Sequence, residues 1–148
     1  MERVSAVSVP LSVWQDPQGD VVLHHSLKEC MIYFGCWLDS GEPADYVGTI
    51  LFRRAFAVRG RYSEFLPYLI ESKNRSEIYI IENSKWLTEL IEEPSPYQSS
   101  LSRTHRPEYF HYVVKGHDNY YEIIAAGYEE GVLPLEQTGE LARLISEA

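Results

Sequence analysis

The segment 47–59 constrains the fold most, because its apolar and polar residues alternate as they do along a β-strand with one buried face. The even positions form the expected core face, with Arg54 as the exception. Apart from Arg54, these positions are apolar or glycine: Gly48, Ile50, Phe52, Phe56 and Val58. The preceding run, 29–38, is apolar on both faces, which is typical of a central strand. A short polar loop joins the two runs, so we expect them to pair in an antiparallel arrangement.

Two hairpins are expected where strand-like runs flank turn-forming residues. In the first, a proline and a glycine make the turn signal strong, and the second is built around a Gly-His-Asp sequence. The strand pairs and their turns are 4–14 and 21–23 around 16–20, and 109–115 and 119–128 around 116–118.

Helical spacing occurs in two segments. The sequence Glu82-Asn83-Ser84 is a good N-cap signal, and apolar side chains recur at helical intervals after it until Pro94 ends the pattern. A short apolar strand at 77–81 precedes this helix. The segment 133–147 also carries leucines at helical spacing, although Gly139 weakens a helix there.

Together these elements predict the fold class. We expect one α+β domain over residues 1–148, with a mainly antiparallel sheet of about five or six strands, a short mid-chain helix and a C-terminal helix. The polar segment 94–107 has few apolar residues that could anchor it, so it is predicted to be a mobile loop.

Acidic residues outnumber basic ones, which limits the class of partner. The chain has 13 Lys and Arg against 22 Asp and Glu, a formal net charge of −9. Nucleic-acid binding depends largely on basic residues that neutralise phosphates, so we expect no nucleic-acid partner. A basic protein is a better match for an acidic chain.

The sequence also bears on location and redox state. No segment approaches the ~20 apolar residues of a membrane-spanning helix, and residues 1–5 do not resemble a signal peptide, so we expect no membrane partner. Cys30 and Cys36 would lie about 20 Å apart along one extended strand, too far for a disulfide bond. We therefore expect two free thiols in a cytoplasmic protein.

Several motifs that carry metal, nucleotide or nucleophile chemistry are missing. The two cysteines and five histidines form no Cys-x-x-Cys and no helical His-x-x-x-His pattern. Gly-x-Gly-x-x-Gly and Gly-x-Ser-x-Gly are absent as well. The sequence therefore predicts no metal and no cofactor, and it singles out no catalytic residue.

One stretch does carry polar residues that could act in catalysis. His117 and Asp118 lie in the turn of the second hairpin and are followed by Tyr120, Tyr121 and Glu122. A general acid–base pair could be built from His117 and Glu122. The interpretation that we favour makes Asp118 a turn former and the tyrosines strand residues.

Charged and aromatic clusters leave further alternatives open. Arg53, Arg59 and Arg61 would share one face of the long strand and could bind an anion or an acidic peptide. They could equally pair with the chain's own carboxylates, for example from the acidic C-terminal helix, and the excess of acid favours this internal pairing. The tyrosines between 109 and 128 suit either packing or a protein interface.

The leading functional hypothesis is a small acidic, non-enzymatic binding protein, with an inhibitor or an immunity-type protein that covers a basic protein partner as its concrete form. Carboxylates after residue 117, among them Glu122, Glu129 and Glu130, would then make the contact. The alternatives are an enzyme or small-ligand-binding domain that uses the hairpin around His117, and an oligomeric structural protein. The last alternative would form a homo-oligomer through a sheet edge or the tyrosine face.

Overall fold

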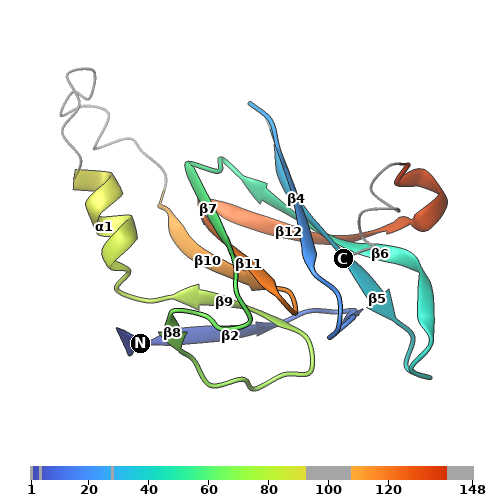
Figure 1. Cartoon of the computed structure of the whole chain (residues 1–148). Helices are drawn as coiled ribbons and strands as arrows, with labels where there is room; N and C mark the ends of the chain where they lie inside the picture. Colours follow the sequence, from blue (N-terminus) through green and yellow to red (C-terminus); the bar gives the residue numbers. More distant parts are fainter. Residues whose placement is uncertain (1, 4, 28, 93–107, 140–148) are drawn as a thin grey trace.

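The computed structural model describes residues 2–3, 5–27, 29–92 and 108–139, and two curled antiparallel sheets dominate it (Figure 1). Sheet I has the order β2-β9-β10-β11-β7. Its strands are β2 (Ala6–Pro10), β9 (Glu77–Ile81), β10 (Phe110–Lys115), β11 (Asn119–Ala125) and β7 (Ala57–Tyr62). Sheet II has the order β12-β6-β5-β3, and β4 also pairs with β5. Its strands are β12 (Gly127–Pro134), β6 (Pro43–Arg53), β5 (Cys30–Trp37), β3 (Trp14–Gln15) and β4 (Val21–His25).

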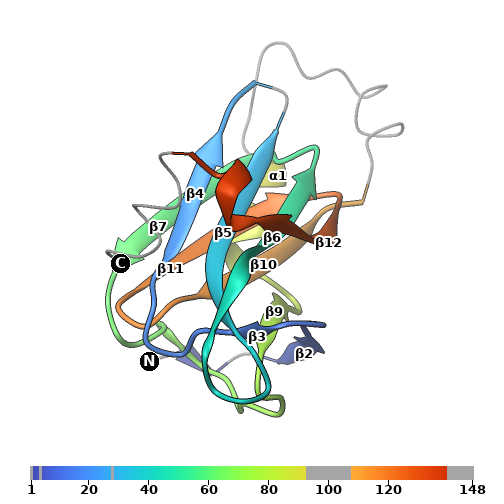
Figure 2. The same cartoon turned by 90° about the vertical axis from the view of Figure 1, so that its right-hand side faces the viewer.

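Three small elements complete the described structure. The strands β1 (Glu2–Arg3) and β8 (Tyr68–Leu69) pair in parallel. The helix α1 (Lys85–Glu92) follows β9 and lies on the side of sheet I that faces away from sheet II, and a 3-10 turn, η1 (Leu135–Gln137), follows β12. In Figure 2 the strands of sheet II cross in front of sheet I, and α1 lies behind it. We call the face of sheet I on the side of α1 its outer face.

The main core lies between the two sheets. Alternate residues of β5 are buried there, together with β6 side chains such as Ile50 and Phe52. Sheet I contributes Tyr112, Val114 and Ile123 to the same core. A second, smaller core on the outer face of sheet I contains Tyr68, Tyr79, Ile81 and Val113. Sheet I therefore carries buried residues on both of its faces.

The predicted α+β class is wrong, because the described residues are mostly β-strand with a single α-helix. The predicted helix at 133–147 begins within β12 and η1, and residues 140–148 lie outside the described part. Pairing with β6 from Gly127 opposite Arg53 to Pro134 opposite Tyr46 holds β12 extended. This long-range pairing overrides the weak helical spacing of the leucines.

The predicted long strand breaks at Arg54. Gly48, Ile50 and Phe52 are core-facing as expected, but β6 ends at Arg53 and Arg54 has a positive φ of 51°. The chain then crosses into sheet I as β7. Arg53 and Arg59 therefore belong to different sheets, and the prediction that they share one strand face is wrong.

The first predicted hairpin is also wrong. Both β3 and β4 pair with β5, one after the other along its length. Residues 16–20 therefore form a loop between two segments that share a partner strand, and they do not join two strands that pair with each other. The other hairpin is confirmed, since β10 and β11 pair on either side of residues 116–118. The antiparallel pairing of β5 with β6 is confirmed as well. The predicted loop 94–107 lies outside the described residues.

Cys30 and Cys36 are both free and buried on β5, as predicted. Burial raises the pKa of each thiol to about 11, so neither is poised as a thiolate. In the described residues, no helix has the length and apolar character needed to cross a membrane.

Candidate functional site

Strand register brings several polar residues together on the outer face of sheet I. Glu122 of β11 lies between Val113 of β10 and Arg59 of β7. His111 of β10 lies between Ile124 of β11 and Ile81 of β9. Because alternate residues of a strand face the same side, this register places His111, Glu122 and Arg59 on one surface.

Glu122 is the centre of this surface and is 3% exposed. Its carboxylate accepts hydrogen bonds from Arg59 Nε at 2.7 Å and Nη2 at 3.2 Å, and from His111 Nε2 at 2.9 Å. The hydroxyl of Tyr68 donates to the same carboxylate. A buried carboxylate is tolerated when charge and hydrogen bonds compensate it in this way. We call Glu122, Arg59, His111, Tyr68 and Ser84 the Glu122 cluster.

The cluster keeps Glu122 ionised. Burial acts to raise its pKa, but hydrogen bonds from His111, Arg59 and Tyr68 outweigh burial and lower the pKa to about 2. The pKa of Tyr68 moves the other way, because burial and the neighbouring carboxylate both disfavour a phenolate. At neutral pH Glu122 therefore acts as an acceptor and Tyr68 as a hydroxyl donor.

His111 connects this carboxylate to Ser84. The imidazole is 1% exposed, and its Nδ1 lies 2.6 Å from Ser84 Oγ. Ionised Glu122 has no proton to donate, so Nε2 of His111 carries the proton in their hydrogen bond. In the neutral ring Nδ1 is then an acceptor, and the hydroxyl of Ser84 donates to it.

The local chain path explains the position of Ser84. Strand β9 ends at Ile81, and Asn83 takes a positive φ of 54° in the tight turn that follows. The N–H of Leu87 donates to Ser84 Oγ at 3.0 Å, which confirms Ser84 as the N-cap of α1. The side chain of Ser84 thus lies at the start of the helix, directly above β10.

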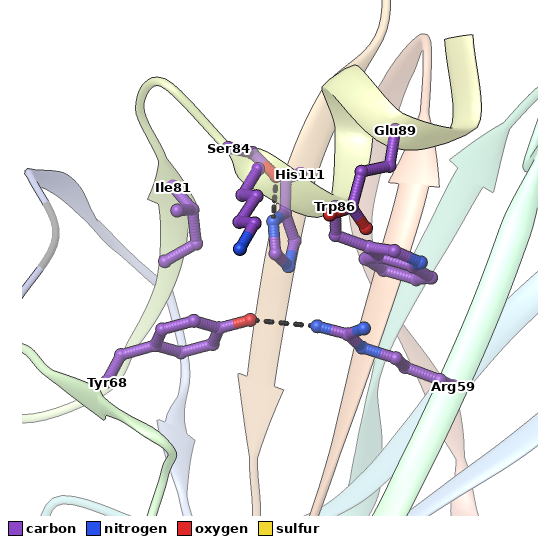
Figure 3. Close-up of a pocket in the computed structure, with 8 residues that line it drawn as sticks. Arg59, Tyr68, Ile81, Ser84, Trp86, Glu89 and His111 are labelled. Carbon is purple, nitrogen blue, oxygen red and sulfur yellow. Dashed lines mark hydrogen bonds between the residues drawn. The ribbon is translucent and has the colours of Figure 1, made fainter. Parts of the chain in front are cut away.

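A pocket of about 240 Å³ opens beside the cluster (Figure 3). Ser84, His111, Tyr68 and Arg59 line it together with Lys85, Glu89 and Trp86 of α1. The guanidinium of Arg59 stacks on Trp86, with Cζ 3.9 Å from the ring centroid. The edge of Trp86 also contacts His111. Arg59 is therefore fixed by Glu122 on one side and by an aromatic face on the other.

The structure does not bring the predicted acid–base pair together. His117 is 46% exposed in the turn between β10 and β11, where its Nδ1 lies 2.9 Å from Asp118 Oδ1. Glu122 instead pairs with His111. The turn interpretation is supported by a backbone contact, since Gly116 N donates to Asn119 O across the turn at 2.7 Å.

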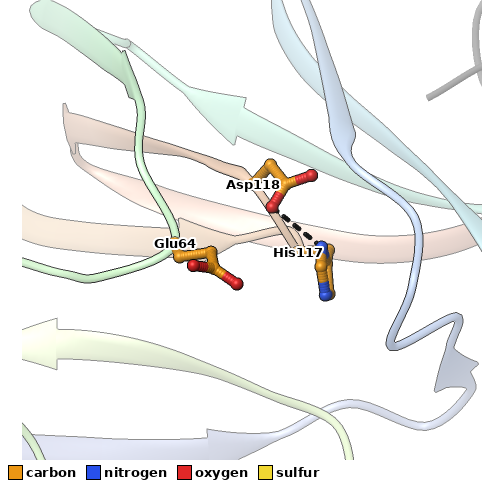
Figure 4. A group of neighbouring side chains, drawn as sticks. All are labelled: Glu64, His117 and Asp118. Atoms are coloured by element: carbon orange, nitrogen blue, oxygen red, sulfur yellow. Dashed lines mark ion pairs between the residues drawn. The ribbon is translucent and has the colours of Figure 1, made fainter.

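His117 and Asp118 approach Glu64 at this turn (Figure 4). One ligand-type atom from each side chain lies within 4.8 Å of the others, so this trio has the oxygen and nitrogen donors that a divalent cation uses. All three side chains are exposed to solvent, and His117 already pairs with Asp118.

Arg53 and Arg59 pair internally, as predicted, although their partners come from strands, whereas Arg61 has no ion pair among the described residues. Arg53 Nη1 lies 2.8 Å from Glu129 Oε1, and Arg59 pairs with Glu122. Glu130 accepts hydrogen bonds from the backbone and hydroxyl of Ser12 at 2.7 and 2.8 Å. Each of these three glutamates therefore has a partner within the chain.

Two of the predicted tyrosines serve packing. Tyr120 is buried on β11, and Tyr121 is half-buried against the core between the sheets. Burial raises the pKa of Tyr121, and the electrostatic effects of Tyr62 and Asp20 raise it further. Neither side chain contributes to the pocket beside α1.

Sequence reasoning missed His111, Tyr68 and Trp86 and assigned Ser84 a capping role alone. One signal was present, because Glu122 is a charged residue inside the apolar run of β11. Extending the predicted hairpin register from its turn would have placed His111 near Glu122 on the same face. No local pattern indicates the contacts with Ser84 and Tyr68.

No family model, curated protein or solved structure matches the chain. The role of the site therefore has to be inferred from its own geometry.

Proposed function

We propose that the protein binds a small molecule in the pocket beside α1. The observation that supports this proposal is the fixed wall of the pocket. Buried Glu122 holds Arg59, Tyr68 and His111 in place through four hydrogen bonds, three of them 2.7–3.2 Å long. A site whose polar groups are already held loses little conformational freedom when its ligand binds.

The charges around the pocket favour a ligand with an acceptor oxygen. Lys85 contributes an ammonium, Arg59 a guanidinium, and the start of α1 the backbone N–H groups of Lys85 and Trp86, which have no partner in the part of the chain that the structure describes. The exposed carboxylate of Glu89 also lines the pocket, and the guanidinium of Arg59 is paired with Glu122. The volume of the pocket, about 240 Å³, lies below the usual range for pockets that bind drug-sized ligands. The proposed ligand is therefore a small organic molecule that carries a carboxylate or carbonyl oxygen.

Calorimetric titration with benzoate tests this proposal. Benzoate should bind, and Lys85→Ala should weaken its affinity about tenfold through loss of one charge-assisted contact. Lys115→Ala is the matched control, because Lys115 lies on β10 away from α1 and contacts Gly116 O. Benzylamine, a cation of similar size, should bind much more weakly. Equal binding of the two probes, or equal effects of the two lysine variants, would contradict the proposal.

An acidic surface for a basic protein is a second candidate function. The net charge of −9 favours it, and Glu129 and Glu130 are exposed. A basic partner captured from lysate should associate more slowly at high salt and with the double variant Glu129→Gln, Glu130→Gln. Association that is insensitive to both changes would eliminate this candidate.

A further inference from the structure

We infer that Ser84 is a nucleophile that small carboxylic esters acylate, with His111 as its general base and Glu122 as the residue that orients the base. This inference rests on the proposed function, because it requires a small carbonyl compound to enter the pocket beside α1. It goes further by assigning a reaction to that pocket.

The first support is the continuous chain of contacts from Ser84 to Glu122. Ser84 Oγ lies 2.6 Å from one nitrogen of His111, and the other nitrogen lies 2.9 Å from Glu122. A hydroxyl in hydrogen-bond contact with a base, and a base oriented by a third group, are the geometric requirements of nucleophilic catalysis. The nitrogen that accepts the serine proton differs from that of the usual serine triad, since here Nδ1 faces the serine and Nε2 faces the carboxylate.

The second support is the protonation pattern. Glu122 accepts hydrogen bonds from three residues, so Nε2 of His111 is the donor in their contact, and in the neutral tautomer that this contact selects Nδ1 is an acceptor. The N–H of Leu87 donates to Ser84 Oγ, which leaves the serine's own proton for Nδ1. The hydroxyl proton is thus directed at the base before any ester arrives.

The third support is the start of α1. Lys85 and Trp86 follow Ser84 as the first residues of the helix. The N–H groups of Leu87 and Thr88 donate to Ser84, whereas those of Lys85 and Trp86 make no hydrogen bond within the described residues. Backbone donors next to a nucleophile stabilise the oxyanion that forms during acyl transfer. Ser84 is 6% exposed and lines the pocket together with His111, so a small ester that enters the pocket reaches both side chains.

The reaction has two stages. Ser84 Oγ bonds to the ester carbonyl carbon while its proton passes to His111 Nδ1, and the N–H groups of Lys85 and Trp86 bind the oxyanion. The carbon–oxygen bond to the alcohol then breaks, and the alcohol oxygen takes the proton from Nδ1. Water next attacks the acyl-serine and gives a proton to Nδ1, which returns it to Ser84 as the carboxylic acid leaves.

The test uses p-nitrophenyl acetate with the full chain, with rapid acid quench and peptide mass mapping. We expect a burst of about one p-nitrophenolate per chain and an acetyl group on Ser84. Ser84→Ala should abolish both. Ser84→Asn is a second variant, because asparagine retains the N-cap of α1 without a hydroxyl. Ser12→Ala is the control, since the Ser12 hydroxyl donates to the carboxylate of Glu130 and lies away from any histidine contact.

Two further variants separate chemistry from folding. His111→Gln and Glu122→Gln should slow the burst by about 100-fold or more while circular dichroism shows a folded protein. Acetylation confined to lysines, or an unchanged burst in Ser84→Asn, overturns the inference. Benzoate binding without acetyl-Ser84 overturns it and leaves the proposed function intact. Acetyl-Ser84 without benzoate binding supports the inference and contradicts carboxylate recognition by Lys85.

Discussion

Two glutamates of sheet I, Glu122 and Glu77, are buried in similar ways and have different surroundings. The pKa of each carboxyl is lowered to about 2, and each borders a pocket other than the one beside α1. Burial acts to raise the pKa of Glu77 as well, and hydrogen bonds outweigh it. These shared properties alone therefore do not distinguish a functional carboxylate from a structural one.

The partners of the two carboxylates differ. Glu77 accepts from neutral groups: the hydroxyls of Ser72 and Tyr79 at 2.6 and 2.9 Å, the hydroxyl of Ser8 and the backbone N–H of Asn74 at 2.9 Å. Glu122 accepts from a guanidinium and an imidazole. Glu77 thus fixes the loop before β9, whereas Glu122 sets the protonation of a histidine that contacts a serine.

Acid tests both carboxylates at once and has the largest expected effect. An unfolded glutamate titrates near ~4.3, so the unfolded chain takes up protons first as the pH falls. The stabilisation is complete above about pH 5 and is lost between about pH 5 and pH 2, on the order of 5 kcal/mol for the two groups. Urea unfolding across this range measures the loss. A double variant, Glu77→Gln with Glu122→Gln, should show a smaller dependence on pH.

Removal of Glu122 should have the next largest effect. Glu122→Ala leaves His111 and Tyr68 buried without their acceptor and leaves Arg59 without its ion pair, so we expect a loss of about 3–4 kcal/mol in unfolding free energy. Urea unfolding at neutral pH measures it. A loss below about 1 kcal/mol would show that water replaces the carboxylate and would weaken the case for a rigid pocket wall.

Glu77→Gln should cost less, about 1–3 kcal/mol, because the amide keeps one acceptor oxygen and the hydroxyls of Ser72 and Tyr79 can rotate to accept. The change should leave benzoate binding and Ser84 acetylation unaltered. Denaturation and the two functional assays, run side by side, check this separation. Loss of acetylation in Glu77→Gln would erase the distinction between the two carboxylates.

Glu129→Gln should have the smallest effect. Its ion pair with Arg53 is a surface contact in which Glu129 is 62% exposed. Exposed pairs of this kind contribute about 0.2–1 kcal/mol and weaken with salt. Thermal unfolding at low and high salt measures the change. A cost as large as that of Glu122→Ala would show that burial does not separate these two ion pairs.

Local patterns predicted the elements that local physics controls. A run of apolar residues located β5, and alternation of apolar and polar residues located β6. Turn residues located the β10–β11 hairpin, and the N-cap signal ending at Ser84 located α1. The crossing at Arg54 has one signal in the sequence, an arginine at an expected core position. The extended conformation of β12 has no such signal, because the spacing of its leucines fits a helix and only the pairing with β6 makes it a strand.

The candidate site follows the same division. Internal pairing of Arg53 and Arg59 could be predicted from the excess of acid, and the free thiols from strand spacing. The contact between Ser84 and His111 could not, because the two are 27 residues apart and meet through the pairing of β9 with β10. The polar residues around His117 instead predicted an acid–base site at a turn that is exposed to solvent.

The order of strands also bears on how the chain reaches its fold. In sheet I, β2 pairs with β9 and β7 with β11, and in sheet II, β6 pairs with β12, so both sheets join early and late parts of the chain. Closing such distant pairs costs entropy before any contact compensates it, and topologies of this kind fold in milliseconds to seconds. During synthesis, β6 cannot pair with β12 until β12 has left the ribosome. Until then the edge of β6 is unpaired and exposed to other chains.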